Sequence, residues 1–170
     1  MAGTSSGGGG PQNKNIGAHI LIVEARFYEG IADDMVAGAV AVLEAHGCTY
    51  ERVAVPGALE IPQVLTAALQ LGRFEAEDES ATPFDGVVAI GCVVRGETYH
   101  FEIVCDNANH WLMEVASLEG VPVGNAILTV DTIQQAEERA KGGAAGKGGD
   151  AARACLRLIE IRQAFETAGS

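Results

Sequence analysis

Hydrophobic and polar positions follow two alternating periods along the chain. Short continuous apolar runs are typical of strands covered on both faces, whereas apolar residues three or four positions apart indicate helices. The pattern predicts strands at residues 19–24, 49–55, 86–92 and 122–129, and helices at residues 31–46, 61–71, from 100 onward, 132–141 and 147–167. Because strands that alternate with helices are joined by right-handed crossovers, we predict an α/β fold. It should be a three-layer α/β/α sandwich with a four-stranded, mainly parallel sheet.

The helix that follows residue 100 is predicted to bury one face against this sheet. Its apolar positions recur at helical spacing and are Ile103, Val104, Ala108, Leu112 and Val115.

Two stretches fall outside the periodic pattern. Residues 1–15 are rich in Gly and Ser and contain no apolar segment typical of a signal peptide. We therefore predict a disordered tail followed by a single domain at residues 16–170. Residues 72–85 are acidic and aperiodic, and we expect them to form a solvent-exposed loop.

Composition and charge exclude several classes of protein. A formal net charge of −12 argues against a nucleic-acid binder, because phosphate backbones require clustered Lys and Arg. No apolar run approaches the roughly 20 residues that span a bilayer, so we expect no membrane insertion. The four cysteines are far apart and form no CxxC pair, so we predict neither a metal site nor disulfides. Free thiols fit a cytoplasmic protein.

Candidate chemistry is concentrated where the predicted strands end, which is where ligands bind in open α/β sheets. Residues 91–102 carry an apolar strand into a polar turn that ends on His100. Backbone N–H groups at a helix start, with Arg95 nearby, suit a phosphate, and an imidazole moves protons near neutral pH. The turn therefore indicates chemistry on a phosphorylated metabolite.

Each candidate side chain also has a structural interpretation. Phe27 could be a core or lid aromatic, or could stack on a flat heterocycle. Glu60 could complement a helix dipole or could bind a ligand hydroxyl. His100 could be a solvated surface residue, and Arg139 and Lys147 could be ordinary surface charges or could clamp a phosphate.

Several of these segments, in this order, resemble lumazine synthases. The resemblance covers residues 19 to about 165, and its motifs are Ala25-Arg-Phe27, Val55-Pro-Gly-Ala-Leu-Glu-Ile-Pro62, residues 91–101, Ile127-Leu-Thr129, Gln135-Ala136 with Arg139, and Lys147-Gly148. It implies a flavodoxin-like fold, assembly into pentamers, and active sites shared between neighbouring subunits. It also implies the condensation of 5-amino-6-ribitylaminouracil with 3,4-dihydroxy-2-butanone 4-phosphate, without a cofactor or metal.

The resemblance assigns a role to each candidate. His100 would be the general acid and base. Phe27 would stack on the pyrimidine. The ribityl chain would be bound by Ala58, Leu59 and Glu60, the uracil edge by the backbone of Cys92, Val93 and Val94, and the phosphate by Glu97 and Thr98, with Arg139 and Lys147 arriving from a neighbouring subunit.

Two features bear on specificity and assembly. Asn125 stands where many relatives carry an aromatic that covers the substrate ring, so that wall of the site should be more polar. Members of the resembled family form free pentamers, dimers of pentamers or shells of twelve pentamers, and the small assemblies often have a longer turn between the last two helices. The turn at residues 142–146 is short, so the resemblance implies a sixty-subunit icosahedral shell. Riboflavin synthase is then a candidate partner.

Two alternatives belong to other classes of protein. A flavin- or lumazine-binding shell protein without turnover would keep Phe27 but would not need His100. A phosphoacceptor receiver domain would need acidic residues at the end of the first strand, whereas Asp33 and Asp34 fall within the first predicted helix.

Overall fold

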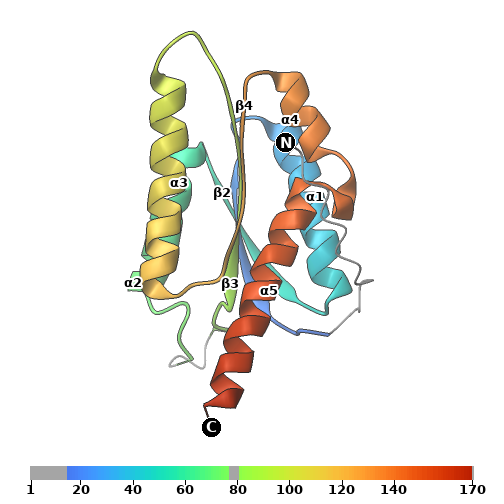
Figure 1. The fold of residues 1–170 in the computed structure, drawn as a ribbon, viewed down its shortest axis with the longest axis vertical. Coiled ribbons are helices and arrows are strands. Elements are labelled where there is room, and N and C mark those ends of the chain that lie inside the picture. Colours follow the sequence, from blue (N-terminus) through green and yellow to red (C-terminus); the bar gives the residue numbers. More distant parts are fainter. Residues whose placement is uncertain (1–14, 77–80, 170) are drawn as a thin grey trace.

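The computed structural model describes residues 15–76 and 81–169 (Figure 1). Its centre is a four-stranded sheet in the order β2-β1-β3-β4, in which every neighbouring pair is parallel. The strands are β1 (His19–Ala25), β2 (Thr49–Val55), β3 (Gly86–Val94) and β4 (Val123–Val130). The predicted disordered tail lies outside the described residues, apart from Asn15.

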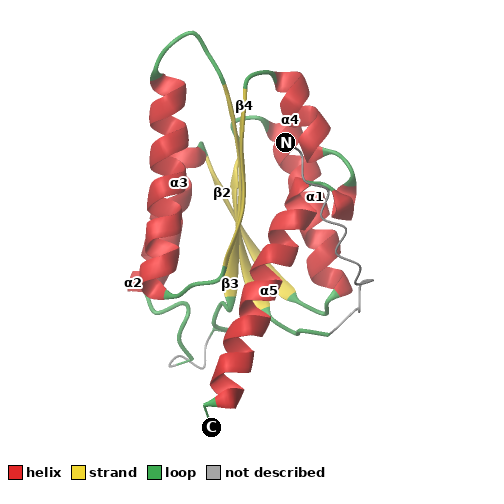
Figure 2. Ribbon diagram, in the orientation of Figure 1, coloured by secondary structure: helices red, strands yellow, loops and turns green. Residues whose placement is uncertain are grey.

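Five α-helices of the described chain cover the two faces of the sheet (Figure 2). One face carries α2 (Ile61–Gln70) and α3 (His100–Glu119), and the other carries α1 (Glu29–Ala45), α4 (Ile133–Ala140) and α5 (Lys147–Ala168). The predicted three-layer sandwich with a parallel sheet is therefore confirmed, as is the flavodoxin-like arrangement that the resemblance implied.

Burial along the strands explains the order of the sheet. In β1 every residue after His19 is buried, and in β3 the first seven residues are buried, as expected for central strands covered on both faces. By contrast, Val55 is the one buried residue of β2, which forms an edge of the sheet.

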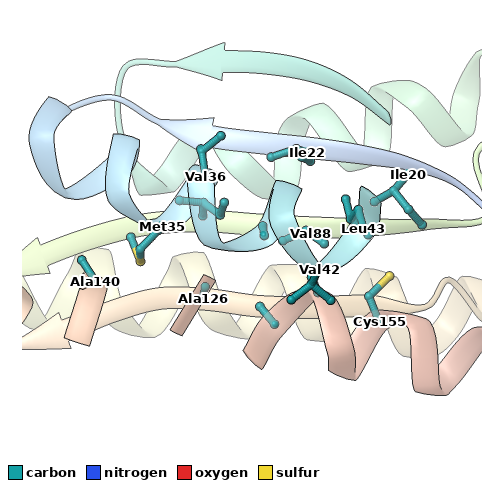
Figure 3. Packing of buried hydrophobic residues seen from close by; sticks show 14 of the residues in the cluster. Ile20, Ile22, Met35, Val36, Val42, Leu43, Val88, Ala126, Ala140 and Cys155 are labelled. Carbon is teal, nitrogen blue, oxygen red and sulfur yellow. The ribbon is translucent and has the colours of Figure 1, made fainter. Parts of the chain in front are cut away.

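The side chains of β1 alternate between two halves of the core. Ile20 and Ile22 pack with Met35, Leu43 and Val88 beneath α1 and α5 (Figure 3). The intervening residues of β1, Leu21 and Val23, belong to the second half of the core, beneath α2 and α3. There they pack with Leu65, Ala89 and Leu112. This alternation fixes the register of β1 against its neighbours, because a one-residue slip would exchange the two sets.

Two sequence predictions about burial are wrong. Ile103 is 44% exposed, and Ala116 is buried in its place on the inner face of α3. Ile103 lies in a groove between α2 and α3, outside the layer that contacts the sheet. The loop at residues 72–85 is also more than an exposed excursion, because Phe84 is buried and stacks on the His19 ring with 5.1 Å between centroids.

Candidate active site

A cavity of about 400 Å³ opens at the carboxyl ends of the strands, where the α/β pattern predicted a ligand. Its wall is formed by the segment after β1, the turn between β2 and α2, the end of β3 and the first turns of α3. It brings together nine of the predicted site residues: Phe27, Ala58, Leu59, Glu60, Cys92, Val93, Val94, Thr98 and His100.

His100 is the first residue of α3 and is exposed to solvent. Among the described residues no side chain hydrogen-bonds its ring, so both nitrogens can meet a ligand. The residue before it, Tyr99, is the N-cap and makes no side-chain capping bond. His100 thus presents an imidazole at the wall of the cavity, where it can accept or donate a proton.

Phe27 lies in the short segment between β1 and α1 at the cavity mouth. Its side chain is 73% exposed, so Phe27 is not a core aromatic. Its ring meets that of Tyr28 edge to face, with 5.0 Å between centroids. Tyr28 also lines the cavity. The two rings together offer a surface on which a flat heterocycle can stack.

Glu60 ends the short 3₁₀ turn Ala58–Glu60 that leads into α2. Its Oε2 accepts a hydrogen bond from the Gly57 backbone N–H at 2.8 Å. This bond folds residues 57–60 into a loop whose inner side faces the cavity. Glu60 therefore shapes the wall and presents a carboxylate to the cavity, whereas the binding of a ligand hydroxyl stays a prediction.

The end of β3 forms an apolar wall behind these groups. Burial raises the pKa of the Cys92 thiol to about 11, so Cys92 is neutral and contributes a small apolar surface, not a nucleophile. Val93 and Val94 are half-buried and follow it toward the cavity. The turn that follows contributes Gly96 and Thr98, whereas Glu97 is exposed and lies outside the lining.

The sequence suggested that Arg95 lies beside a bound phosphate, but Arg95 does not line the cavity. Its guanidinium donates to Asp131 at 2.8 Å and to Glu102 at 2.5 Å, and it lies 4.3 Å from the centroid of the Phe101 ring. The lining contains no Lys or Arg. In the described part of a single chain, the cavity therefore has the imidazole of His100 but no Lys or Arg for an anionic ligand.

Three other predicted residues lie apart from the cavity. Arg139 and Lys147 belong to α4 and α5, on the sheet face opposite α3, where they bond to the Gln135 carbonyl and to Asp150. Asn125 is exposed on the edge strand β4, and its amide donates to Asn109 at 2.8 Å. One chain thus does not unite the whole predicted set.

An ion-pair network around Glu24, in the strand that precedes Phe27, was not predicted from the sequence. Glu24 is only 3% exposed, although it sits in a run interpreted as apolar. Its carboxylate accepts from Arg52 at 2.7 and 3.0 Å and from Arg26 at 3.0 Å. Arg26 also binds Asp33 at 2.7 Å. A glutamate within an apolar strand, next to a strand that contains an arginine, is the pattern that could have predicted this network.

Burial disfavours the ionised form of Glu24, and the two neighbouring arginines favour it. Desolvation alone would raise the pKa of this carboxyl, but hydrogen bonds and charges from Arg52 and Arg26 hold it below its usual value. Glu24 therefore stays charged and ties β1 to β2 immediately before the Phe27 segment.

The described residues contain no group of three or more side chains arranged to hold a metal ion. They also contain no helix that is long and apolar enough to cross a membrane.

Comparison with known proteins identifies the family of this chain. Residues 17–163 match the family model of 6,7-dimethyl-8-ribityllumazine synthase. The chain is 48% identical over 163 residues to the protein of that name from Azorhizobium caulinodans, a match that covers 96% of this chain and 98% of the relative. It is 50% identical over 147 residues to the one from Nitrobacter hamburgensis, covering 86% and 87% of the two chains. It is also 50% identical over 145 residues to 6,7-dimethyl-8-ribityllumazine synthase 1 of Rhizobium meliloti, covering 85% and 92%. The chain therefore belongs to the 6,7-dimethyl-8-ribityllumazine synthase family.

Proposed function

We propose that the protein condenses 5-amino-6-ribitylaminouracil with 3,4-dihydroxy-2-butanone 4-phosphate to give 6,7-dimethyl-8-ribityllumazine, releasing phosphate and water. Membership of the family makes the chain an enzyme of riboflavin biosynthesis. The observation that carries the specific proposal is the convergence of His100 and the exposed Phe27 ring on one cavity at the strand ends.

Each step of this reaction moves a proton. The amine of the uracil adds to the ketone and forms an imine with loss of one water, phosphate then leaves by elimination, and ring closure with loss of a second water completes the lumazine. A group that donates and accepts near neutral pH serves all three steps, and His100 is the one imidazole in the lining. Phe27 would hold the pyrimidine ring by stacking, so that its amine lies close to the ketone.

Polar groups around the cavity suit the remaining parts of the substrates. Glu60 would accept from a hydroxyl of the ribityl chain, beside Ala58 and Leu59. Backbone groups of residues 92–94 would pair with the uracil edge. The N–H groups of Glu97 and Thr98, ahead of α3, would face the phosphate, which favours a helix N-terminus.

We further propose that a neighbouring copy completes the site. A phosphorylated substrate needs a cation, and the lining of one chain offers none. Arg139 and Lys147 of an adjacent subunit would supply the positive charge, and Asn125 of that subunit would form a polar wall. This arrangement fits a cytoplasmic pentamer, and the short 3₁₀ turn Gly143–Ala145 between α4 and α5 favours a shell of twelve pentamers. A mass near that of one pentamer in light scattering would reject the shell.

The decisive experiment mixes the purified protein with the two proposed substrates and follows lumazine fluorescence. Continuous product formation that depends on both substrates supports the enzyme. A protein that binds lumazine or a flavin in stoichiometric amount, without product formation from the two substrates, would instead be the non-catalytic shell protein. Omission of the phosphorylated substrate is the matched control, because it leaves the stacking partner present.

A further inference from the structure

We propose that Arg95 is a positioning residue that fixes the turn before His100 and is not a ligand of the substrate phosphate. The proposal rests on the function proposed above and concerns a residue to which the resemblance assigned no role. It reverses the first interpretation of the sequence, which placed Arg95 beside an anion.

Arg95 joins three segments that meet at the cavity end of the sheet. Its backbone N–H donates to the Val130 carbonyl at 2.8 Å, which extends the pairing of β3 with β4 by one residue. Its Nε donates to Asp131 in the turn after β4, and its Nη1 donates to Glu102 in the first turn of α3. The side chain therefore ties the end of the sheet to the start of α3.

The contacts of Arg95 hold Phe101 and Glu102, the two residues that follow His100. The Arg95 guanidinium stacks over the Phe101 ring at 4.3 Å, and Phe101 lines the cavity next to His100. Tyr99 supplies no side-chain cap, and Arg95 contacts both Phe101 and Glu102 in the first turn of α3. A helix start that lacks its cap frays more readily, so loss of Arg95 would let the His100 backbone move.

The charges around Arg95 make it a poor anion site. Two carboxylates, Asp131 and Glu102, share this single cation, so the cluster is net negative. The hydrogen bonds that the guanidinium donates to Asp131 and to Glu102 raise its pKa, and Arg95 in turn lowers the pKa of Glu102. A phosphate brought to this guanidinium would have to displace a carboxylate and would then face its repulsion.

The test compares Arg95→Ala, Arg95→Lys, Asp131→Asn and the double variant Arg95→Ala/Asp131→Asn by steady-state kinetics with both substrates. A small misplacement of an acid–base group lowers turnover far more than ground-state binding, so Arg95→Ala should reduce kcat by about tenfold or more. KM for the phosphorylated substrate and inhibition by inorganic phosphate should change by less than about twofold. Arg95→Lys should not restore kcat, because an ammonium cannot bridge two carboxylates in the planar geometry of a guanidinium.

The double variant supplies the second criterion. If Arg95 acts through Asp131, then Asp131→Asn alone should lower kcat and should add no further loss to Arg95→Ala. Arg157→Ala is the matched control, since Arg157 is an exposed arginine on α5 that pairs with Glu160, and it should leave both constants unchanged.

Opposite results would overturn the positioning role. A raised KM for the phosphorylated substrate with weaker phosphate inhibition and unchanged kcat would make Arg95 a phosphate ligand. Full activity in Arg95→Lys, or additive losses in the double variant, would equally reject it. An unmodified protein that forms no lumazine would refute the proposed function itself, before any variant is compared.

Discussion

His100 begins α3 at the cavity wall, where its ring is exposed and bonded to no side chain of the described residues. Its removal should therefore cost chemistry and little stability. We expect His100→Gln, which keeps a polar side chain but cannot shuttle a proton, to lower kcat by about 10²–10⁴-fold. Thermal unfolding should stay within a few degrees of the unmodified protein, as expected for an exposed site. Lumazine fluorescence and circular dichroism measure the two effects.

The matched control for this variant is His110→Gln on the same helix. His110 is also exposed, but it pairs with Glu114 one turn further along and lies outside the cavity lining. The His110→Gln variant should retain full turnover. Equal kinetics in both variants would remove His100 from the mechanism.

Glu24 presents the opposite case, a buried charge whose contribution is mainly to stability. Glu24→Gln would leave Arg52 and Arg26 close together without the carboxylate between them, and we expect it to cost about 1–3 kcal/mol of unfolding free energy. Urea unfolding at neutral pH measures this loss. Because the ion pairs of Glu24 lie immediately before Phe27, the proposed stacking residue, the KM for the uracil substrate should rise as well.

The same carboxyl predicts a pH dependence with a definite sign. The pKa of Glu24 is lowered in the folded protein from its usual value of 4.5, so the folded state favours the charged form. Its stabilisation is fully present above the unfolded pKa and is lost as pH falls through the folded pKa. The stability gap between the unmodified protein and Glu24→Gln should therefore stay constant from neutral pH down to about pH 5.5 and shrink below about 4.5. A gap that widens in acid would contradict this assignment.

At the scale of elements, the approach of α5 to α1 depends on glycine. A Cβ on Gly148 would overlap the backbone carbonyl of Met35, and neither backbone can move far in a layer that also contacts the sheet. We expect Gly148→Ala to destabilise the fold by about 1–3 kcal/mol, because overpacked helices must shift apart. Gly30 near the start of α1 has open space around its missing Cβ, so Gly30→Ala should be neutral or stabilising by about 0.4–1 kcal/mol. If Gly148→Ala were instead neutral or stabilising, as expected for Gly30→Ala, then helix propensity and not packing would set the effect.

The elements themselves were largely predictable from local pattern. The strand at Thr49–Val55 was predicted with its observed bounds, since turn residues flank it on both sides. The local pattern could not predict which side chains are buried by contacts with residues distant in the sequence. Ile103 has a core-like spacing but faces the groove beside α2, and Phe84 is buried because His19 and Arg73 cover it from distant positions in the chain.

Predictions for the site divide in the same way. Phe27, Glu60 and His100 each follow a strand end, so the topology rule was sufficient to bring them to one edge of the sheet. The partners of Arg95 were not predictable from spacing, because Asp131 is distant in sequence and reaches Arg95 only through the pairing of β3 with β4.

At the scale of the whole molecule, a single chain separates the base from the cations proposed for the same reaction. His100 starts a helix on one face of the sheet. Arg139 lies in the last turn of a helix on the other face, among acidic neighbours on a chain of net charge −12. If active sites form between copies, each site takes His100 from one subunit and Arg139 from the next. Activity then becomes a property of pairs of subunits.

Subunit mixing tests this arrangement directly. His100→Gln and Arg139→Ala chains, each of which we expect to have low activity alone, are unfolded together in equal amounts and refolded. A shared site is intact wherever a subunit with His100 meets a neighbour with Arg139, so random assembly should restore about a quarter of the normal activity. If each site lies within one chain, no combination restores it, and the mixture stays as inactive as its components. Refolding each variant separately and mixing afterwards is the control, because stable oligomers that do not exchange subunits should then show no recovery.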